Sequence, residues 1–143
     1  MEQLHDINTF VKMITDKGYN GAFQTSSAYP DTLGKSIRRF LDACEKGTDY
    51  PLNENKLMLR TFLEWNGEDR PYTDCVMWVK WKDNSFDVES MEVERKNRYS
   101  VSMKKMAFNN LTTTTMPSVQ EVLSQIIEQN RNRITPPKRR IGI

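Results

Sequence analysis

The 143-residue sequence has one histidine, two cysteines and no long apolar run. A helix that crosses a bilayer needs about 18 or more consecutive apolar residues, so we expect no transmembrane helix. The first residues, MEQLHDINTF, also lack the charged-then-apolar order of a signal peptide. Two cysteines are too few for a disulfide framework. We therefore expect a cytoplasmic protein with reduced cysteines and no membrane partner.

The scarcity of histidine and cysteine also limits the chemistry. His5 alone cannot supply the several ligands of a zinc site. Cys44 and Cys75 occupy apolar positions of their segments, which disfavours either as a nucleophile activated by His5. Gly34-Lys35-Ser36 is not a P-loop, because Tyr29 stands where that motif needs its first glycine. We expect no catalytic residue, no metal and no cofactor, although a carboxylate-based active site would leave no motif.

Large apolar residues are present in sufficient number for a packed core, with three Trp, five Tyr, six Phe and eight Met. The length fits one domain, and the net charge of +2 is too small to favour a disordered chain. We therefore expect a single α+β domain over residues 1–134, followed by a basic, proline-containing tail over residues 135–143.

Apolar residues recur at helical spacing in three segments. Residues 4–14 predict a first helix that ends at Lys17-Gly18, and residues 33–44 predict a second. Ser118 and Glu121 have the spacing of a capping box and precede an apolar stripe, which predicts a final helix.

Between the second and third helices the pattern changes to alternation. Residues 73–108 predict a three-stranded antiparallel meander with two-residue turns at Asp83-Asn84 and Lys96-Asn97. Residues 56–65 fit either a strand or a helix, and the turn-like NGEDRP that follows favours a fourth strand. The expected fold is two N-terminal helices, a three- or four-stranded antiparallel meander and one C-terminal helix, with the helices over the apolar sheet face.

The two turns predict a register. The expected pairs are Trp81–Phe86, Val79–Val88, Met77–Ser90, Ser90–Met103 and Glu92–Val101. This register collects on one, buried face Cys75, Met77, Val79, Trp81, Phe86, Val88, Tyr99, Val101 and Met103. The opposite face carries Trp78, Met91 and Val93 among charged residues, with the charge pairs Lys80–Asp87 and Glu89–Lys104.

Trp78 raises the question of function, because lysines flank it on the exposed face. An exposed aromatic among lysines can stack on bases, but it can also be covered by a helix or a second protein chain. Asp87 and Glu89 lie beside it and would repel phosphate. The absence of an RNA-binding motif with clustered glycines and aromatics further favours a protein contact.

The surplus of basic residues lies near the end of the chain, where no acid follows Glu128. Such a tail suits an acidic protein surface or a nucleic acid. The chain carries the defining residues of no known family. Its general make-up, a small α+β unit without a catalytic motif, is similar to that of many accessory proteins of phages and mobile elements.

Two hypotheses follow. The first is a non-enzymatic protein-interaction module, self-associating or part of a larger assembly. Its expected partner-binding residues are Trp78, Met91, Val93, Ile134, Ile141 and Ile143. The alternative is a nucleic-acid-binding accessory protein. Its expected contacts are Lys80, Lys104, Lys105, Arg131, Arg133, Lys138, Arg139 and Arg140. Raised salt would weaken the second kind of binding steeply and the first only slightly.

Overall fold

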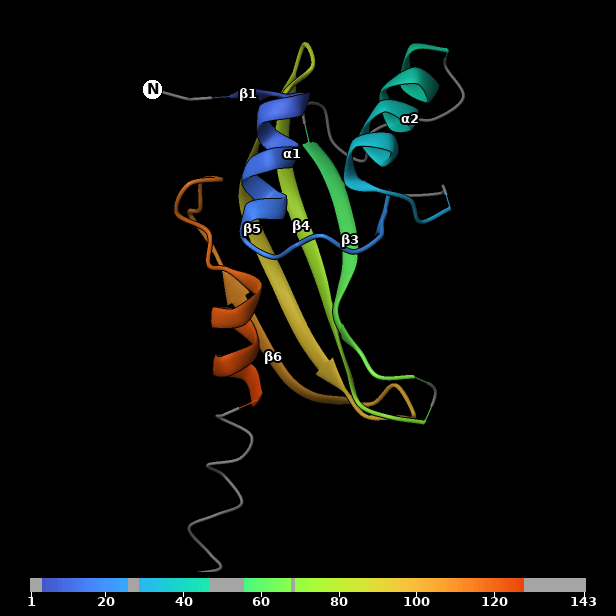
Figure 1. Ribbon diagram of the computed structural model, residues 1–143, viewed down its shortest axis with the longest axis vertical. Coiled ribbons are helices and arrows are strands. Elements are labelled where there is room, and N and C mark those ends of the chain that lie inside the picture. The colour runs from blue at the N-terminus through green and yellow to red at the C-terminus, as the bar shows by residue number, and fades with distance from the viewer. Residues whose placement is uncertain (1–3, 26–28, 47–55, 68, 128–143) are drawn as a thin grey trace, which may run out of the picture.

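The computed structural model is a curled antiparallel sheet with three helices (Figure 1). It describes residues 4–25, 29–46, 56–67 and 69–127. The elements are β1 (His5–Asp6), α1 (Ile7–Asp16), β2 (Phe23–Gln24), α2 (Leu33–Glu45), β3 (Lys56–Trp65), β4 (Tyr72–Lys82), β5 (Ser85–Lys96) and β6 (Ser102–Phe108). A C-terminal helix follows over residues 119–127. The expected α+β class is confirmed, but the sheet has six strands where we expected three or four.

Strand order explains the difference. The sheet runs β1-β5-β4-β3-β2, and β6 also pairs with β5. β1 pairs with the first two residues of β5, whereas β6 pairs with its C-terminal half. The two additional strands, β1 and β2, are two residues long each, which is too short for an alternating pattern. β3 resolves the ambiguity of residues 56–65 in favour of a strand.

All three helices pack on one face of the sheet, as Figure 1 shows. The buried apolar side chains of the helices are Phe10, Ile14, Leu33, Ile37, Phe40, Val122 and Ile126. They form one cluster with the sheet residues Leu57, Leu59, Cys75, Met77, Val79, Phe86, Val88, Met91 and Val93. We call the opposite side of the sheet the outer face. Within the described residues, no helix contributes a buried side chain to it.

α1 begins at Ile7, later than the predicted start at residue 4, because His5 and Asp6 form β1; its end before Gly18 and the start of the C-terminal helix agree with the prediction. α1 is capped at Asp6, whose carboxylate accepts a hydrogen bond from the Thr9 N–H, and it ends before Gly18, whose φ is +97°. At the C-terminal helix, the Glu121 N–H donates to Ser118 Oγ (3.1 Å) and the Ser118 N–H donates to Glu121 Oε1 (2.8 Å). The capping box is therefore confirmed.

The segment before the C-terminal helix is tied to the end of α1. Lys17 Nζ donates to the carbonyl oxygens of Thr114 and Met116, both at 2.6 Å. The Val119 N–H donates to the Lys17 carbonyl oxygen at 2.9 Å. These bonds join two segments about a hundred residues apart and place the C-terminal helix beside α1 on the sheet.

The first hairpin of the meander forms as predicted. Asp83 and Asn84 both have positive φ (50° and 68°), as a two-residue turn of this hand requires. The pairs Trp81–Phe86, Val79–Val88 and Lys80–Asp87 are confirmed. Trp81 is half-buried against the core, and its ring lies edge-on to Phe40 with centroids 5.9 Å apart.

A β-bulge then overturns the predicted pairing of Met77 with Ser90. Trp78 pairs with Ser90 while Val79 pairs with Val88, so Glu89 is an extra residue in β5. The extra residue reverses which side chains face the helices. Met91 and Val93 consequently point into the core, where they are 1% and 0% exposed. Our expectation that they lie on the outer face is wrong.

The second predicted turn is also wrong, and with it the register between β5 and β6. Asn97 Oδ1 accepts hydrogen bonds from the N–H groups of Tyr99 and Val101, which builds a loop over residues 97–101 in place of a two-residue turn. Ser90 and Glu92 therefore do not pair with Met103 and Val101. Tyr99 and Val101 are exposed loop residues, not core residues, because the longer loop carries them past the end of the sheet.

The longer loop changes the partners further along the two strands. Glu92 pairs with Ala107, and Lys104 lies opposite Arg95 instead of Glu89. Met103, expected in the core, is only half-buried beside the register shift in β6.

Candidate interaction surface

The outer face is built from rows of residues that run across β3, β4 and β5. The central row is Met58, Trp78 and Ser90; the next row toward the ends of the hairpins is Arg60, Val76 and Glu92. Trp78 is half-buried. Its place on the outer face, between Val76 and Lys80, agrees with the sequence prediction.

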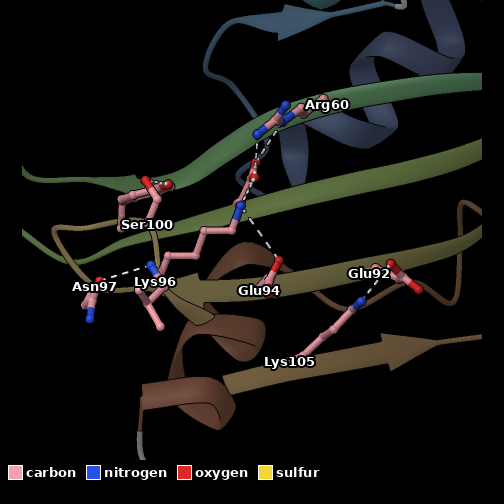
Figure 2. Close-up of polar contacts among 10 residues, drawn as sticks. Arg60, Glu92, Glu94, Lys96, Asn97, Ser100 and Lys105 are labelled. Atoms are coloured by element: carbon pink, nitrogen blue, oxygen red, sulfur yellow. Dashed lines mark hydrogen bonds and ion pairs between the residues drawn. The ribbon is translucent and has the colours of Figure 1, made fainter. Parts of the chain in front are cut away.

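Ion pairs surround this apolar centre, as Figure 2 shows for one side of it. Asp74 and Glu94 lie directly opposite each other, an arrangement of like charges that is unfavourable alone. Arg60 offsets it by holding both Asp74 oxygens, at 3.2 and 2.7 Å, and Lys96 lies 3.5 Å from Asp74 and 3.8 Å from Glu94. Lys105 pairs with Glu92 at 3.7 Å.

The far end of the outer face carries a cluster of aromatic side chains. A second bulge, between Phe62 and Glu64, changes the phase of β3 so that Phe62 pairs with Asp74 and Trp65 with Tyr72. Phe62, Trp65 and Tyr72 consequently share the outer face. Their ring centroids lie 5.2, 5.5 and 5.7 Å apart, with tilted or edge-on planes. We call these three residues the aromatic cluster.

A hollow of about 400 Å³ lies at the aromatic cluster, between the β3–β4 and β5–β6 connections. We call it the hairpin-end hollow. Its lining residues are Arg60, Phe62, Trp65, Gly67, Asp69, Arg70, Tyr72, Arg98 and Ser100. The hydroxyls of Tyr72 and Ser100 are hydrogen-bonded at 2.9 Å, which joins the two hairpins across the hollow. The Arg98 guanidinium lies over the ring of Tyr99, 4.8 Å from its centroid.

The structure places two of the residues that the sequence suggested for chemistry, Cys75 and Ser36, in the interior. Burial raises the pKa of the Cys75 thiol to about 12, with a smaller contribution from Asp74, so the thiol stays protonated at neutral pH. Ser36, from the Gly34-Lys35-Ser36 segment, is buried and donates to the carbonyl oxygen of Phe23 at 2.8 Å. In the described ranges, no three His, Cys, Asp or Glu residues are arranged to hold a metal ion.

The predicted site residues are only partly brought together. Of the three described members of the expected partner-binding set, Trp78 lies on the outer face, whereas Met91 and Val93 are in the core. Among the expected nucleic-acid contacts, Lys80 lies on the outer face, Lys105 is exposed beside Glu92, and Lys104 is half-buried on the opposite face. The remaining predicted residues lie outside the described part of the chain: Arg131, Arg133, Ile134, Lys138, Arg139, Arg140, Ile141 and Ile143.

Sequence reasoning missed the aromatic cluster. Phe62 and Trp65 are three residues apart, so strict alternation would put them on opposite faces. The spacing was nevertheless a usable signal, because a bulge between two exposed aromatics would bring them to one side.

No helix in the described ranges is long and apolar enough to cross a membrane. The comparisons with known proteins add no further assignment, since no family model, curated protein or solved structure matches this chain. The interpretation of the surface therefore rests on its own geometry.

Proposed function

We propose that this protein is a non-enzymatic interaction module that binds a partner protein through the outer face, centred on the aromatic cluster. The observation that carries the proposal is the exposure of that cluster. Phe62 is 48% and Trp65 is 55% exposed, although each is large enough to anchor a core. Clustered apolar side chains in water are typical of contact sites, and Trp, Tyr and Arg dominate binding energy at protein interfaces.

The arrangement of the rings favours a protein over a nucleic acid. Bases stack on ring faces that are open and spaced along the strand. Here Phe62, Trp65 and Tyr72 lie against one another at interplanar angles of 45° to 78°. Their exposed edges and partial faces offer an irregular apolar surface, which suits the aliphatic and aromatic side chains of a protein.

The charges of the outer face favour the same conclusion. Nucleic-acid affinity comes largely from cations that neutralise phosphates. Several outer-face cations already have carboxylate partners: Lys56 with Glu89, Arg60 with Asp74, Lys96 with Asp74 and Glu94, and Lys105 with Glu92. Binding a phosphate chain here would bring it close to those same carboxylates.

The proposed partner is either a second copy of this chain or another protein of a larger assembly. In either case, the partner covers the aromatic cluster and removes it from water. A homo-oligomer would show a mass in solution above the 16.8 kDa of one chain. The same surface would then be occupied by a second copy, and changes to Phe62 and Trp65 would return the mass to that of a monomer.

The test uses the full chain as immobilised bait in an extract of the source cells, with and without nuclease. The wild type is compared with a Phe62→Ala/Trp65→Ala variant, and a Tyr29→Ala variant is the control, because Tyr29 is 85% exposed and lies outside the outer face. Circular dichroism establishes that each variant is folded. Light scattering of the same proteins measures self-association.

We expect the double variant to lose about tenfold or more of a specific captured protein, or of the homo-oligomer, at both low and high salt. Tyr29→Ala should retain it. Capture or oligomerisation that is unchanged by Phe62→Ala/Trp65→Ala would contradict the proposal. Recovery that disappears with nuclease would favour the nucleic-acid alternative instead.

A further inference from the structure

We propose that the hairpin-end hollow recognises an acidic segment of the partner, in which a carboxylate side chain sits between Arg70 and Arg98 while a neighbouring apolar side chain contacts the aromatic cluster. This inference rests on the proposed function and specifies the chemistry of the partner. It commits to an acidic side chain within a peptide segment as the occupant.

The charge of the lining supports the first half of the proposal, the contact with a carboxylate. Among the described residues, three arginines line the hollow, Arg60, Arg70 and Arg98, together with one acid, Asp69. Arg60 is already held by Asp74. Within the described residues, Arg70 and Arg98 have no carboxylate within ion-pair distance. The hollow therefore presents two guanidinium groups that are not neutralised, at an end of the sheet where other cations are paired.

Arginine is well suited to this role. Its planar guanidinium donates two parallel hydrogen bonds to a carboxylate, which gives direction as well as attraction. Arg60 and Asp74 show this two-oxygen contact within the same lining, at 3.2 and 2.7 Å. An incoming aspartate or glutamate would repeat that contact with Arg70 or Arg98.

The aromatic cluster supports the second half of the proposal, the contact with a neighbouring apolar side chain. Phe62, Trp65 and Tyr72 form the apolar wall of the hollow, and Arg70, which also lines it, is exposed. The Tyr72–Ser100 hydrogen bond fixes this wall to the β5–β6 loop. A volume of about 400 Å³ is at the small end of the range for ligand sites and fits one or two side chains. The hollow thus matches a short motif that combines one acid with one apolar residue.

A polyanion is the weaker match. Asp69 lines the hollow, and Asp74 and Glu94 lie beside it under the Arg60 and Lys96 side chains. A chain of closely spaced phosphates would meet those three acids after the first contact. A single carboxylate can pair with Arg70 and Arg98, and the rest of its peptide segment need bring no further negative charge close to those acids.

The test begins with a library of random 12-residue peptides displayed on phage and selected against the full-length wild type. A selected sequence is then synthesised with a fluorophore, in its natural form and with every acid replaced by its amide. Fluorescence anisotropy measures the binding of both peptides. The proteins compared are the wild type, Arg70→Ala/Arg98→Ala, Phe62→Ala/Trp65→Ala and, as a control of equal charge, Lys12→Ala/Lys46→Ala on the helices. A labelled thymidine oligonucleotide is measured in parallel.

We expect the selected peptides to be enriched in Asp or Glu next to an apolar residue. Replacing the acids by amides and replacing Arg70 and Arg98 by alanine should each weaken binding by about tenfold or more, and the two changes together should weaken it little further. Lys12→Ala/Lys46→Ala should bind as the wild type does, since both lysines lie in exposed pairs within helices.

Four results would overturn the inference. The first is a selection that yields no enriched peptide. The second is a selection of peptides without acids that still depend on Phe62 and Trp65, which would leave the proposed function intact. Binding of the acidic peptide that is insensitive to Arg70→Ala/Arg98→Ala would also refute it. An oligonucleotide that binds more tightly than the peptide, and loses affinity in the arginine variant, would replace a protein partner by a nucleic acid and refute both proposals.

Discussion

Glu64 turns toward the helix-bearing side of the sheet, although it lies between Phe62 and Trp65, two residues of the outer face. The bulge in β3 causes this, because it pairs Glu64 with Thr73. The carboxylate accepts hydrogen bonds from Thr73 Oγ1 (2.9 Å) and Arg95 Nε (3.2 Å). Burial raises the pKa of Glu64, but these hydrogen bonds outweigh it, so the pKa lies below the ordinary value of 4.5.

The stability supplied by Glu64 should therefore depend on pH. A carboxyl group whose pKa is lowered in the folded state stabilises the folded state at a pH above its ordinary pKa. This stabilisation is lost as the pH falls through the lowered pKa. We expect Glu64→Gln to reduce the free energy of unfolding at pH 7 by about 1–2 kcal/mol. Urea unfolding should show that the difference between wild type and variant shrinks as the pH falls below about 4.5.

Glu45→Gln is the control, because Glu45 is an exposed glutamate near the end of α2. It should change the free energy of unfolding by no more than about 0.5 kcal/mol. A Glu64→Gln penalty that stays constant from pH 7 to pH 3 would contradict the assignment of a charged, hydrogen-bonded Glu64.

At the scale of the element, the bulge at Glu89 decides which residues of β5 reach the core. Its carbonyl oxygen accepts a hydrogen bond from the Leu111 N–H (2.9 Å), and Thr113 Oγ1 accepts one from the Val88 N–H (3.0 Å). Thr113 also donates its own N–H to Asp87 at 2.8 Å. The segment after β6 thus satisfies backbone groups of β5 at the extra residue and at the residue before it.

Deleting Glu89 should be far more damaging than changing it. Without the extra residue, either Met91 and Val93 turn to solvent or the Val79–Val88 pairing is lost, and each outcome removes several buried apolar side chains from the core. We expect the deletion variant to lose cooperative unfolding in a urea titration. Glu89→Ala, which removes only the ion pair with Lys56, should cost about 1 kcal/mol or less. A deletion variant as stable as Glu89→Ala would show that β5 has no fixed register.

The same bulge marks where prediction of the fold stopped being accurate. The sequence predicted the first hairpin correctly because Asp83-Asn84 fits a two-residue turn and alternation holds from Phe86 to Val88. The apolar residues Val88 and Met91 are three apart, which breaks that alternation and could have been interpreted as a bulge. The Asn97 loop was harder to foresee, since its length depends on hydrogen bonds from Asn97 to two backbone N–H groups.

For the whole molecule, the described core extends from α1 to the C-terminal helix. Val122 and Ile126 of the C-terminal helix are fully buried, and the Lys17 bonds hold that helix beside α1. We therefore expect a chain that ends at Ile134 to unfold in urea at the same midpoint as the full chain. A chain that ends at Leu111 should not fold, because it lacks Thr113 and the C-terminal helix. Loss of cooperative unfolding in the chain that ends at Ile134 would contradict the expected domain boundary.

The candidate site could be predicted only in part, and the reason lies in the three-dimensional arrangement. Trp78 was placed on the outer face from alternation alone. The hairpin-end hollow unites Arg60, Arg70 and Arg98 from two separate hairpins, and no local pattern relates residues that far apart. It depends on the bulge in β3 and on the Asn97 loop, the two kinds of irregularity that the alternating pattern does not reveal.

The bonds between Lys17 and the segment from Thr114 to Val119 have a consequence for biosynthesis. A ribosome releases the N-terminal helices and the first strands well before Val122 and Ile126 exist. Until then, β4 and β5 present Met77, Val88 and Met91 to solvent or to chaperones without their final cover. Folding to the native state must therefore wait until translation has passed residue 126, which makes the nascent chain, more than the finished protein, the form most exposed to aggregation.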